Sequence, residues 1–539
     1  FFKQKTAYEI RNCDWSSDVC SSDLAVVTLP EDLVRAGSRV RIETTRSPLG
    51  LLARAVDWLG DYPYGCTEQT ASALSGGLVR AALIPAEREA ALRERARLAA
   101  HVQRLAALRS NEGLWGWWPG SESDPYLSAV AVAALVRAIE GDVERDLAQS
   151  LLDQAQWGLA RQSGMLRSLD GDAWWAMQVA GMVAANDLAT RFPQVRSTLD
   201  AKLGSLLAQA PQLSPAAHAC AAIACARLGR TEDARALVAG MWEGTVSDAT
   251  GRSLPAGSEA EPWIGDTVER TAWAAEAVGR VASEDPRGPE LLGWLLRHRD
   301  GREWRSTRVT ASVVNALAIW AARPSKSVAE MPTAMTWDGA LLPVDPSGTV
   351  LVPSERLTPG RHAITFSVRG DAPLFWSWDV IAQVPSPGPT PDRTRLVVTR
   401  EYLRAVRTTD RRGRPRWLST PIESGSPLRV GEGVLVRLTL NAARDLRWVA
   451  IDDPVPGGFE IDQVLPDGVD RPWNVHGEAR DGEAGFHVDA LPSGTTVIEY
   501  LIRPELVGRF TALPTSAFGM YDRTLMTRGA EQVLRVGDR

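Results

Sequence analysis

Two neighbouring stretches decide the fold: SPLGLLARAVDWL at residues 47–59 and CTEQTASALSGGLVRAAL at residues 66–83. The first is charged and amphipathic with a helical repeat, whereas the second is small and apolar nearly all round. An amphipathic helix covers a core from outside, and a helix that is apolar on every side must be buried. The pair therefore predicts an outer helix followed by an inner helix.

The same alternation continues to residue 323. Further inner helices are predicted at residues 124–140, 172–185, 214–229, 266–282 and 306–322, each next to a charged outer helix. Six outer and inner pairs, recurring along the chain, predict a closed (α/α)6 toroid. An open solenoid of helix pairs is the alternative.

Beyond residue 323 the pattern changes to short strands separated by Gly, Pro and Asp turns. Residues 324–384 are predicted to form a small β-rich module, and PSPGPTPD at 385–392 is a Pro-rich linker. Residues 393–539 alternate strongly, as in VLVRLTL, and predict a C-terminal antiparallel β-sandwich. With a β-rich lead-in at residues 25–46, the predicted fold class is multidomain, α plus β.

The first 24 residues differ from the rest of the chain. They contain two of the five cysteines, have no apolar signal-peptide core, and resemble a translated sequencing-adapter fragment. We exclude residues 1–24 from the fold prediction as a non-native segment. The chain also lacks an initiator Met, so we expect the natural N-terminus, with any signal or lipoprotein sequence, to lie upstream.

Composition argues against several classes of function. The net charge of −6 and the pI near 5.7 argue against nucleic acid as a partner. No apolar run approaches the ~20 residues that span a bilayer. The remaining cysteines lack disulfide or zinc spacing, and Cys220 and Cys225 are predicted core thiols. The acidic pair Asp452 and Asp453 precedes Pro454 and predicts a turn. We expect no metal and no cofactor.

The stretch YPYGCTEQT at residues 62–70 carries the candidate reactive group. Cys66 opens an inner helix, where the partial positive charge of the helix end favours a thiolate. Positions three apart share a helical face, so the Cys66 sulfur can approach the carboxamide of Gln69. Attack with loss of ammonia would give an internal thioester. Glu68 and the helix-end amides would assist proton transfer and oxyanion stabilisation, and Tyr62 and Tyr64 would keep the bond dry.

Other interpretations of Cys66 compete with this one. The Cys-x-x-Gln spacing also occurs by chance, and a lone cysteine is most often an inert buried thiol. A cysteine hydrolase needs a histidine as its base. His101 and His298 fall on outer helices, which leaves His218 to face the mouth of the toroid, with no Asn or Asp evident to orient it.

The run YPYGCTEQT resembles the thioester motif Gly-Cys-x-Glu-Gln of the alpha-2-macroglobulin and complement superfamily, present here from Gly65 to Gln69. The segments VAIDDPVPGGFE, YLIRPELVGRF and GMYDRT resemble the last macroglobulin-type β-sandwich of its bacterial members. The likeness extends over nearly all of residues 25–539. It implies a C-terminal fragment with a thioester domain at 47–323. A split CUB-type module would surround that domain, its first half ending in the lead-in and its second half at 324–384. A macroglobulin-type domain would follow at 393–539.

The resemblance implies a broad-spectrum endopeptidase inhibitor and not an enzyme. In the family a protease cuts a bait region, the molecule rearranges, and the thioester acylates a surface lysine of the protease. Complement-like members add a histidine a little over a hundred residues after the cysteine. No histidine lies between His101 and His218, which favours direct attack by amines. We expect a periplasmic or envelope-associated protein, with secretion as the alternative and membrane contact only through a lipid anchor on the missing N-terminal part.

The resemblance also implies a cover for the thioester, because in the family the C-terminal domain docks on the thioester domain near the motif. Met520 and Tyr521 fall where a loop tip is expected. Together with Tyr62 and one of Trp117 or Trp118 they would seal the bond. The alternative is that Met520 and Tyr521 simply start a core strand.

Two other classes of function stay open. Thioester domains also serve as covalent adhesins, and an upstream bait region would distinguish an inhibitor from an adhesin. A toroidal enzyme acting on glycans or prenyl chains would need paired carboxylates at the mouth. Asp124, Asp172 and Asp266 precede inner helices, but each is also explained as a helix N-cap.

Overall fold

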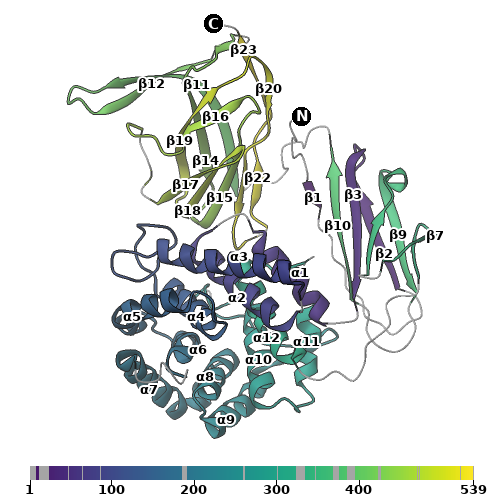
Figure 1. Ribbon diagram of the computed structural model, residues 1–539, viewed down its shortest axis with the longest axis vertical. Coiled ribbons are helices and arrows are strands. Elements are labelled where there is room, and N and C mark those ends of the chain that lie inside the picture. The colour runs from purple at the N-terminus through teal and green to yellow at the C-terminus, as the bar shows by residue number, and fades with distance from the viewer. Residues whose placement is uncertain are drawn as a thin grey trace. The chain divides into compact units, whose positions relative to one another are not determined.

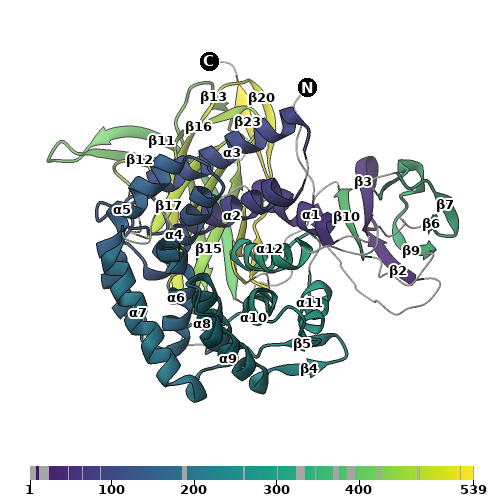
Figure 2. The same ribbon diagram turned by 60° about the horizontal axis from the view of Figure 1, so that its bottom comes forward.

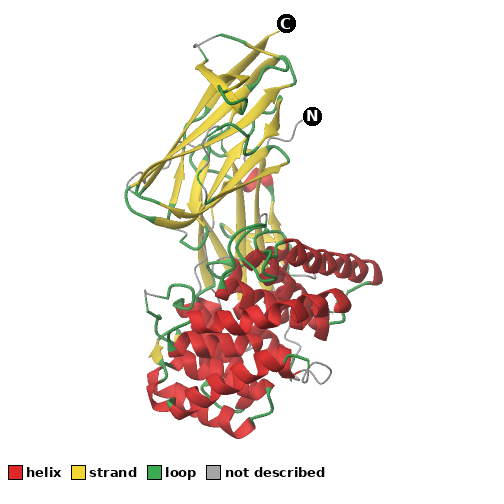
Figure 3. Ribbon diagram, turned by 90° about the vertical axis from the view of Figure 1, so that its left-hand side faces the viewer, coloured by secondary structure: helices red, strands yellow, loops and turns green. Residues whose placement is uncertain are grey.

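The computed structural model describes most of the chain, in two compact units. The described residues are 8–10, 23–45, 48–62, 65–84, 86–184, 191–258, 261–299, 302–322, 334–345, 348–367, 375–384, 395–422, 426–469, 472, 474–522 and 524–537. One unit comprises Glu9–Leu29 and Ser38–Ile381, and the other comprises Phe1–Tyr8, Pro30–Gly37 and Ala382–Arg539. Helices and strands occupy separate parts of the chain, which makes the fold α plus β, as predicted (Figure 3).

The helices all belong to the first unit (Figure 1). In chain order, the α-helices of the described residues are α1 (Pro48–Gly60), α2 (Thr67–Leu83), α3 (Arg88–Ala107), α4 (Pro125–Glu140), α5 (Arg145–Gln162), α6 (Leu169–Ala184), α7 (Pro193–Ala208), α8 (Pro215–Arg227), α9 (Thr231–Met241), α10 (Thr267–Val281), α11 (Gly288–Arg297) and α12 (Thr307–Ala321). A short hairpin of β4 (Val246–Asp248) and β5 (Gly251–Ser253) lies between α9 and α10.

The even-numbered helices contact one another in a cycle. Helix α2 packs on α4, α4 on α6, α6 on α8, α8 on α10, α10 on α12, and α12 returns to α2. The odd-numbered helices lie outside them, each against at least one even-numbered neighbour (Figure 2). Small residues make the close approach workable, since a Cβ on Gly76 of α2 would meet Leu59 of α1 at 2.7 Å.

The starts of the even-numbered helices are fixed by hydroxyl and carboxylate caps. Asp124 caps α4 and Asp266 caps α10, each accepting two backbone N–H groups, while Ser214 and Ser306 cap α8 and α12. Asp172 instead lies within the first turn of α6 and pairs with Lys202. These caps satisfy N–H groups that a helix start leaves without partners.

Strands from both sides of the helical region share two sheets. Their bounds are β1 (Tyr8–Ile10), β2 (Asp23–Leu29), β3 (Val34–Thr45), β6 (Ala334–Trp337), β7 (Ala340–Leu342), β8 (Thr349–Val352), β9 (Gly360–Ser367) and β10 (Phe375–Gln383). The strand orders are β1-β10-β3-β8 and β2-β9-β6-β7. Strand β1 and the first two residues of β2 belong to the segment that the sequence prediction set aside.

The C-terminal strands form three sheets around one apolar core. They are β11 (Leu396–Thr409), β12 (Pro415–Pro421), β13 (Leu428–Arg429), β14 (Val434–Ala442), β15 (Leu446–Pro454), β16 (Phe459–Gln463), β17 (Val475–Arg480), β18 (Glu483–Leu491), β19 (Gly494–Pro504), β20 (Gly508–Ala512), β21 (Ser516–Gly519), β22 (Met526–Arg528) and β23 (Gln532–Gly537). Their orders are β12-β11-β14-β19-β16, β17-β18-β15-β21-β22 and β13-β23-β20. Asp452 and Asp453 lie within β15, so the turn predicted for them is wrong.

Candidate functional site

Helix α2 begins with a reciprocal cap between Cys66 and Gln69. The side chain of Cys66, at the N-cap position, faces the backbone N–H of Gln69 in a capping box. In return, the backbone N–H of Cys66 donates to Gln69 Oε1 at 3.1 Å. Cys66 is fully buried and Gln69 is 3% exposed. Each side chain therefore lies at the backbone N–H of the other residue, and both side chains are buried.

Glu68 points to helix α12, at the far end of the helical region in sequence. Its buried carboxylate accepts the Ser72 hydroxyl at 2.7 Å, from the next turn of α2. Thr307, the first residue of α12, donates its hydroxyl to both carboxylate oxygens, at 3.0 and 2.8 Å. A carboxylate held from two sides by hydroxyl donors keeps one orientation, directly beside the Cys66 and Gln69 cap.

The backbone around Cys66 is held by two other elements. Arg104 of α3 donates from Nε and Nη2 to the carbonyl of Gly65, at 3.2 and 3.1 Å. The loop before α4 accepts both donors of Thr67: its hydroxyl reaches the Gly116 carbonyl at 2.6 Å, and its N–H reaches the Trp117 carbonyl at 3.2 Å. A side chain at Gly116 would collide with the Glu122 carbonyl, at 2.1 Å. Only glycine allows the loop to fold back so closely on itself at this residue.

The predicted shielding residues of the helical unit have different surroundings. Trp117 touches the start of α2 through its carbonyl, and its ring meets the ring of Trp263 edge-on at 5.5 Å. Tyr62 lies half-buried with its ring edge-on to Trp58 of α1, at 5.3 Å. Trp118 is buried, and its backbone N–H donates to Ser121. Tyr64 lies outside the described residues.

Met520 and Tyr521 follow strand β21 and lie in the loop before β22, so they do not start a core strand. The N–H of Met520 donates to the Trp448 carbonyl at 2.8 Å, and the ring of Tyr521 meets that of Trp448 at 5.4 Å. Trp448 has a φ of +53°, and the ladder of β15 with β18 has no pair at this residue, although the register is the same on both sides. This left-handed backbone in a bulky residue is uncommon, and it positions the loop that carries Met520 and Tyr521.

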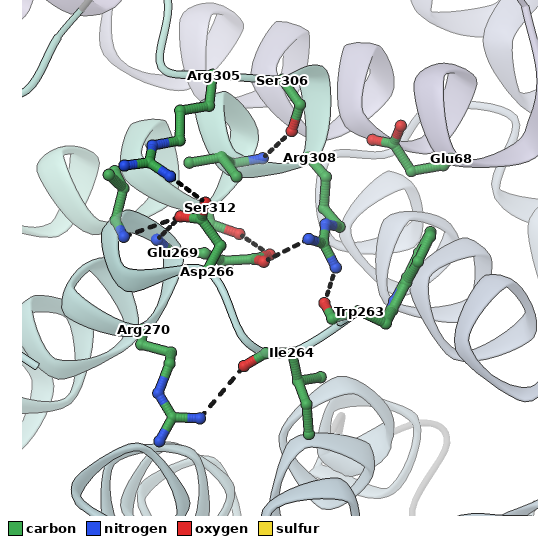
Figure 4. Close-up of polar contacts among 12 residues, drawn as sticks. Glu68, Trp263, Ile264, Asp266, Glu269, Arg270, Arg305, Ser306, Arg308 and Ser312 are labelled. Carbon is green, nitrogen blue, oxygen red and sulfur yellow. Dashed lines mark hydrogen bonds and ion pairs between the residues drawn. The ribbon is translucent and has the colours of Figure 1, made fainter. Parts of the chain in front are cut away.

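A second buried carboxylate, Glu269, lies further along the helices (Figure 4). It pairs with Arg308 at 3.2 Å and accepts the Ser312 hydroxyl at 3.0 Å. Burial raises the pKa of Glu269 to about 7; Arg308 opposes the shift, and the nearby charges of Asp266 and Glu68 add to it. Arg308 is itself shared, because it donates to the Trp263 carbonyl and its guanidinium lies 4.5 Å from the Trp263 ring.

Glu269 and Ser72, the hydroxyl partner of Glu68, border the same space. A cavity of about 70 Å³ lies between the even-numbered helices and is lined by Ser72, Glu269 and Ser312, among other residues. Ser72 donates to Glu68 and Ser312 donates to Glu269, so each carboxylate has a hydroxyl partner on the cavity wall. A polar cavity of this size has room for water.

The other candidate nucleophiles and bases lie elsewhere. The His218 ring contacts the Ser214 carbonyl at 3.1 Å and packs where a side chain on Gly240 of the outer helix α9 would stand. Cys220 and Cys225 are buried, as predicted, and burial raises the pKa of both thiols, in Cys225 to about 11. Within the described ranges, no group of three or more His, Cys, Asp or Glu residues is arranged to hold a metal ion. Nor is any described helix long and apolar enough to cross a membrane.

Sequence reasoning missed Thr307, Arg104, Gly116 and Trp263. Thr307 is 239 residues from its partner Glu68, and nothing in a single sequence marks such a pair. The GLWGWWPG run did carry a signal, since a glycine between tryptophans before a helix indicates close backbone approach.

A family model matches the C-terminal sheets. The model described as the bacterial alpha-2-macroglobulin MG10 domain covers residues 396–523, from β11 to the loop that follows β21. Alpha-2-macroglobulins of two Xylella fastidiosa strains, Temecula1 and 9a5c, are each 26% identical to this chain over 185 residues. Residues 396–523 of this chain therefore resemble a domain of the bacterial alpha-2-macroglobulin family. The matched residues make up 31% of this chain and 10% of either Xylella alpha-2-macroglobulin.

Solved alpha-2-macroglobulin structures have the same fold. A crystal structure of native Escherichia coli alpha-2-macroglobulin, from domain MG7 to the C-terminus, matches 96% of this chain and 81% of its own, with a TM-score of 0.67. Salmonella alpha-2-macroglobulin reacted with methylamine matches 96% of this chain and 33% of its own, with a TM-score of 0.66. Both are 18% identical, so the likeness concerns the fold of the C-terminal region of the family.

Proposed function

We propose that the chain is the C-terminal part of an alpha-2-macroglobulin-like endopeptidase inhibitor, which traps proteases through a thioester between Cys66 and Gln69. The observation that carries the proposal is the buried reciprocal cap, in which the side chain of each residue lies at the backbone N–H of the other. The similarity of the C-terminal part of the chain to bacterial alpha-2-macroglobulins supports the same assignment. The bond is used once, so the protein is an inhibitor and not a catalyst.

Thioester formation requires one attack and one leaving group. Cys66 Sγ attacks Gln69 Cδ, the carbon–nitrogen bond of the carboxamide breaks, and ammonia leaves. The thiol proton passes to the departing nitrogen, and Glu68 is the residue oriented to carry it. The Cys66 N–H on Gln69 Oε1 polarises the carbonyl and stabilises the negative charge of the tetrahedral intermediate.

The trapping step reverses the roles of the two groups. A neutral lysine amine of the target protease attacks Gln69 Cδ, the carbon–sulfur bond breaks, and one proton moves from nitrogen to sulfur. The products are an amide to the protease and a free Cys66 thiol. His218 packs towards α9, which favours direct attack by amines over a histidine-assisted reaction with hydroxyls.

The finer architecture belongs to the same proposal. The cyclic packing of the even-numbered helices supports an (α/α)6 toroid at residues 47–323. The sheets shared by strands before and after the helices support a CUB-type module, split between residues 25–46 and 324–384. After the linker at 385–392, the macroglobulin-type domain at 393–539 would dock on the toroid. Its Met520 and Tyr521 loop, with Tyr62, Tyr64, Trp117 and Trp118, would keep the bond dry. The expected location is the periplasm or cell envelope.

Intact mass and thiol titration test the proposal. A formed thioester makes the chain lighter by one ammonia than its sequence requires, and methylamine then adds its mass and releases one new thiol. Gln69→Glu is the matched control, since a carboxylate has no ammonia to lose and should give neither change. Cys220→Ser should leave both changes intact, because this buried thiol takes no part. A wild-type chain of full sequence mass, with no thiol released by methylamine, would overturn the proposal.

A further inference from the structure

Strands β11 and β12 form a two-stranded arm at one edge of their sheet. They pair antiparallel from Leu403 opposite Pro421 to Thr409 opposite Pro415, and β12 is the edge strand. Figure 1 shows the two strands running out together beyond the neighbouring strands of the sheet. We call residues 403–421 the β11–β12 arm. An edge hairpin of this kind presents both its faces and its tip unless another surface covers them.

The tip of the arm is strongly basic. Residues 407–416 contain five arginines, Arg407, Arg411, Arg412, Arg414 and Arg416, against one acidic residue, Asp410. All five guanidinium side chains belong to exposed residues. The chain as a whole has a net charge of −6, so this concentration of positive charge is local and not a property of the composition. Such a patch selects a partner with dense negative charge.

The tip is also preorganised. Asp410 accepts the N–H groups of Arg412 and Arg414 at 2.8 and 3.0 Å, and its second oxygen accepts Arg414 Nε at 2.8 Å. Gly413 completes the turn with a φ of +75°. Asp410 is therefore occupied within the turn, and a partner that binds the tip has little backbone to order.

The two faces of the arm differ. On one face Trp417 packs with Leu403 and Ala405, and its Nε1 donates to the Asp467 carbonyl at 3.0 Å. On the other face the cross-strand pair Val406 and Leu418 is 65% and 58% exposed. Two large aliphatic side chains stand side by side there, open to solvent.

The open face combines apolar and positive groups. Arg416 lies on the same face as Val406 and Leu418, because it is two residues from Leu418 along β12 and opposite Thr408. Arginine side chains bind phosphate through paired N–H groups, and their stems cover apolar surface. An anionic membrane surface offers phosphates at the depth of the arginines and hydrocarbon just below them.

We propose that the β11–β12 arm docks on the surface of a membrane rich in anionic phospholipid. The arginines of the tip bind headgroup phosphates, and Val406 and Leu418 enter the boundary between headgroups and acyl chains. An acidic protein or a nucleic acid would bind the arginines, but such a partner would not explain the exposed aliphatic pair of Val406 and Leu418. The proposal is independent of the thioester, because no residue of the arm belongs to the α2 site.

Vesicle co-sedimentation of the full chain tests the arm directly. We expect binding to vesicles that contain phosphatidylglycerol, little binding to pure phosphatidylcholine, and loss of binding as salt rises. Arg411→Glu with Arg412→Glu should weaken binding at least tenfold, and Val406→Ser with Leu418→Ser should weaken it severalfold. Arg444→Glu with Arg447→Glu is the matched control: it makes the same charge change at exposed positions of the same domain and should bind like the wild type.

Three results would overturn the proposal. Equal binding to anionic and neutral vesicles would remove the role of the arginines. An equal loss in the Arg444 and Arg447 control would show that overall charge, and not the arm, drives binding. The third result is a chain that does not bind vesicles but self-associates. If Val406→Ser with Leu418→Ser abolishes that self-association, the edge strand β12 pairs with a second copy of the chain and not with a membrane. Circular dichroism and thermal unfolding of each variant identify any loss of folding.

Discussion

The two units each bury a carboxylate next to an arginine, and the two pairs behave differently. In the β-sandwich, Asp453 accepts Arg400 at 2.5 Å, the Tyr500 hydroxyl at 2.6 Å and the Thr515 hydroxyl at 2.7 Å. In the helical unit, Glu269 has Arg308 at 3.2 Å and Ser312 at 3.0 Å. Burial alone lowers the pKa of Arg400, but Asp453, Tyr402 and Tyr500 together outweigh it and raise that pKa. Glu269 instead has its own pKa raised to about 7.

The difference lies in how many hydrogen-bond donors each carboxylate receives and in how much negative charge lies near it. Asp453 receives three short hydrogen bonds, and Arg400 adds one to the Ala512 carbonyl. Arg308 divides its donors between Glu269 and the Trp263 carbonyl, while Asp266 and Glu68 add negative charge nearby. A buried pair is fixed as ions only where further donors complete it. The sandwich pair is therefore a structural element, whereas the helical pair can take up a proton near neutral pH.

The largest expected effect comes from breaking the sandwich pair. Asp453→Ala leaves the buried Arg400 charge without its carboxylate, and we expect a loss of about 3–5 kcal/mol in the free energy of unfolding. Denaturant unfolding followed by fluorescence measures it. Glu499→Ala is the control, because its pair with Arg437 is partly exposed and should contribute about 1 kcal/mol or less. Similar losses in both variants would contradict the structural role of the Asp453 pair.

The sandwich should lose stability in acid through His487. Burial, with the charges of Arg480 and His476, lowers the pKa of His487 to about 3, from 6.5 in the unfolded chain. As pH falls below 6.5 the unfolded state takes up the proton first, so stability declines by about 1.4 kcal/mol per pH unit until the pH nears 3. Unfolding of His487→Gln across this range should be flatter than that of the wild type. Parallel curves would exclude the effect.

The pair of Glu269 and Arg308 should make stability depend on pH in the opposite direction, over a narrower pH range. The pKa of Glu269 is raised from 4.5 to about 7, so its stabilising contribution is complete below pH 4.5 and is lost as pH rises towards 7. The loss is about 1.4 kcal/mol per pH unit within that window. Glu269→Gln should remove this slope, whatever its stability at a single pH. Ser312→Ala, which keeps the carboxyl group, should retain the slope.

The smallest expected effect concerns the partner of Glu68. Thr307→Val keeps the shape of the side chain but removes the hydroxyl that both carboxylate oxygens accept, at a cost of about 1–3 kcal/mol in unfolding. We also expect less ammonia loss from the chain, measured by intact mass, because Glu68 loses its orientation. Thr307→Ser should restore both properties. Ammonia loss equal to wild type in Thr307→Val would separate Glu68 from thioester formation.

Local patterns in the sequence predicted what depends on neighbours along the chain. The run of helices between residues 47 and 323 followed from alternating hydropathy, and the position of Cys66 at the start of an inner helix, with Gln69 in its first turn, followed from the same pattern. The thioester bond itself stays a prediction. Strong alternation likewise indicated the strands of the sandwich, such as β14 and β19.

The features that could not be predicted from the sequence are contacts between segments far apart along the chain. The partner of Glu68 lies on another helix, and the buried Arg400 and Asp453 are 53 residues apart on different strands. Hydropathy also could not predict which way the His218 side chain points, because helix α8 is buried on nearly all sides. In the structure the His218 ring packs on the outer helix α9. The prolines after Asp453 suggested a turn, but β15 continues through Pro454 before the chain turns.

The cap at the start of α2 has a consequence for the order of events at the reactive bond. The atom of Gln69 that accepts the Cys66 N–H is the carbonyl oxygen, and neither reaction proposed for this side chain exchanges that atom. Carboxamide, thioester and protease-linked amide all present the same oxygen to the same donor. In the proposed reactions the substituent would change twice while the helix start keeps its hydrogen bond, so the helix would hold the Gln69 carbonyl in place as the bond is made and later broken.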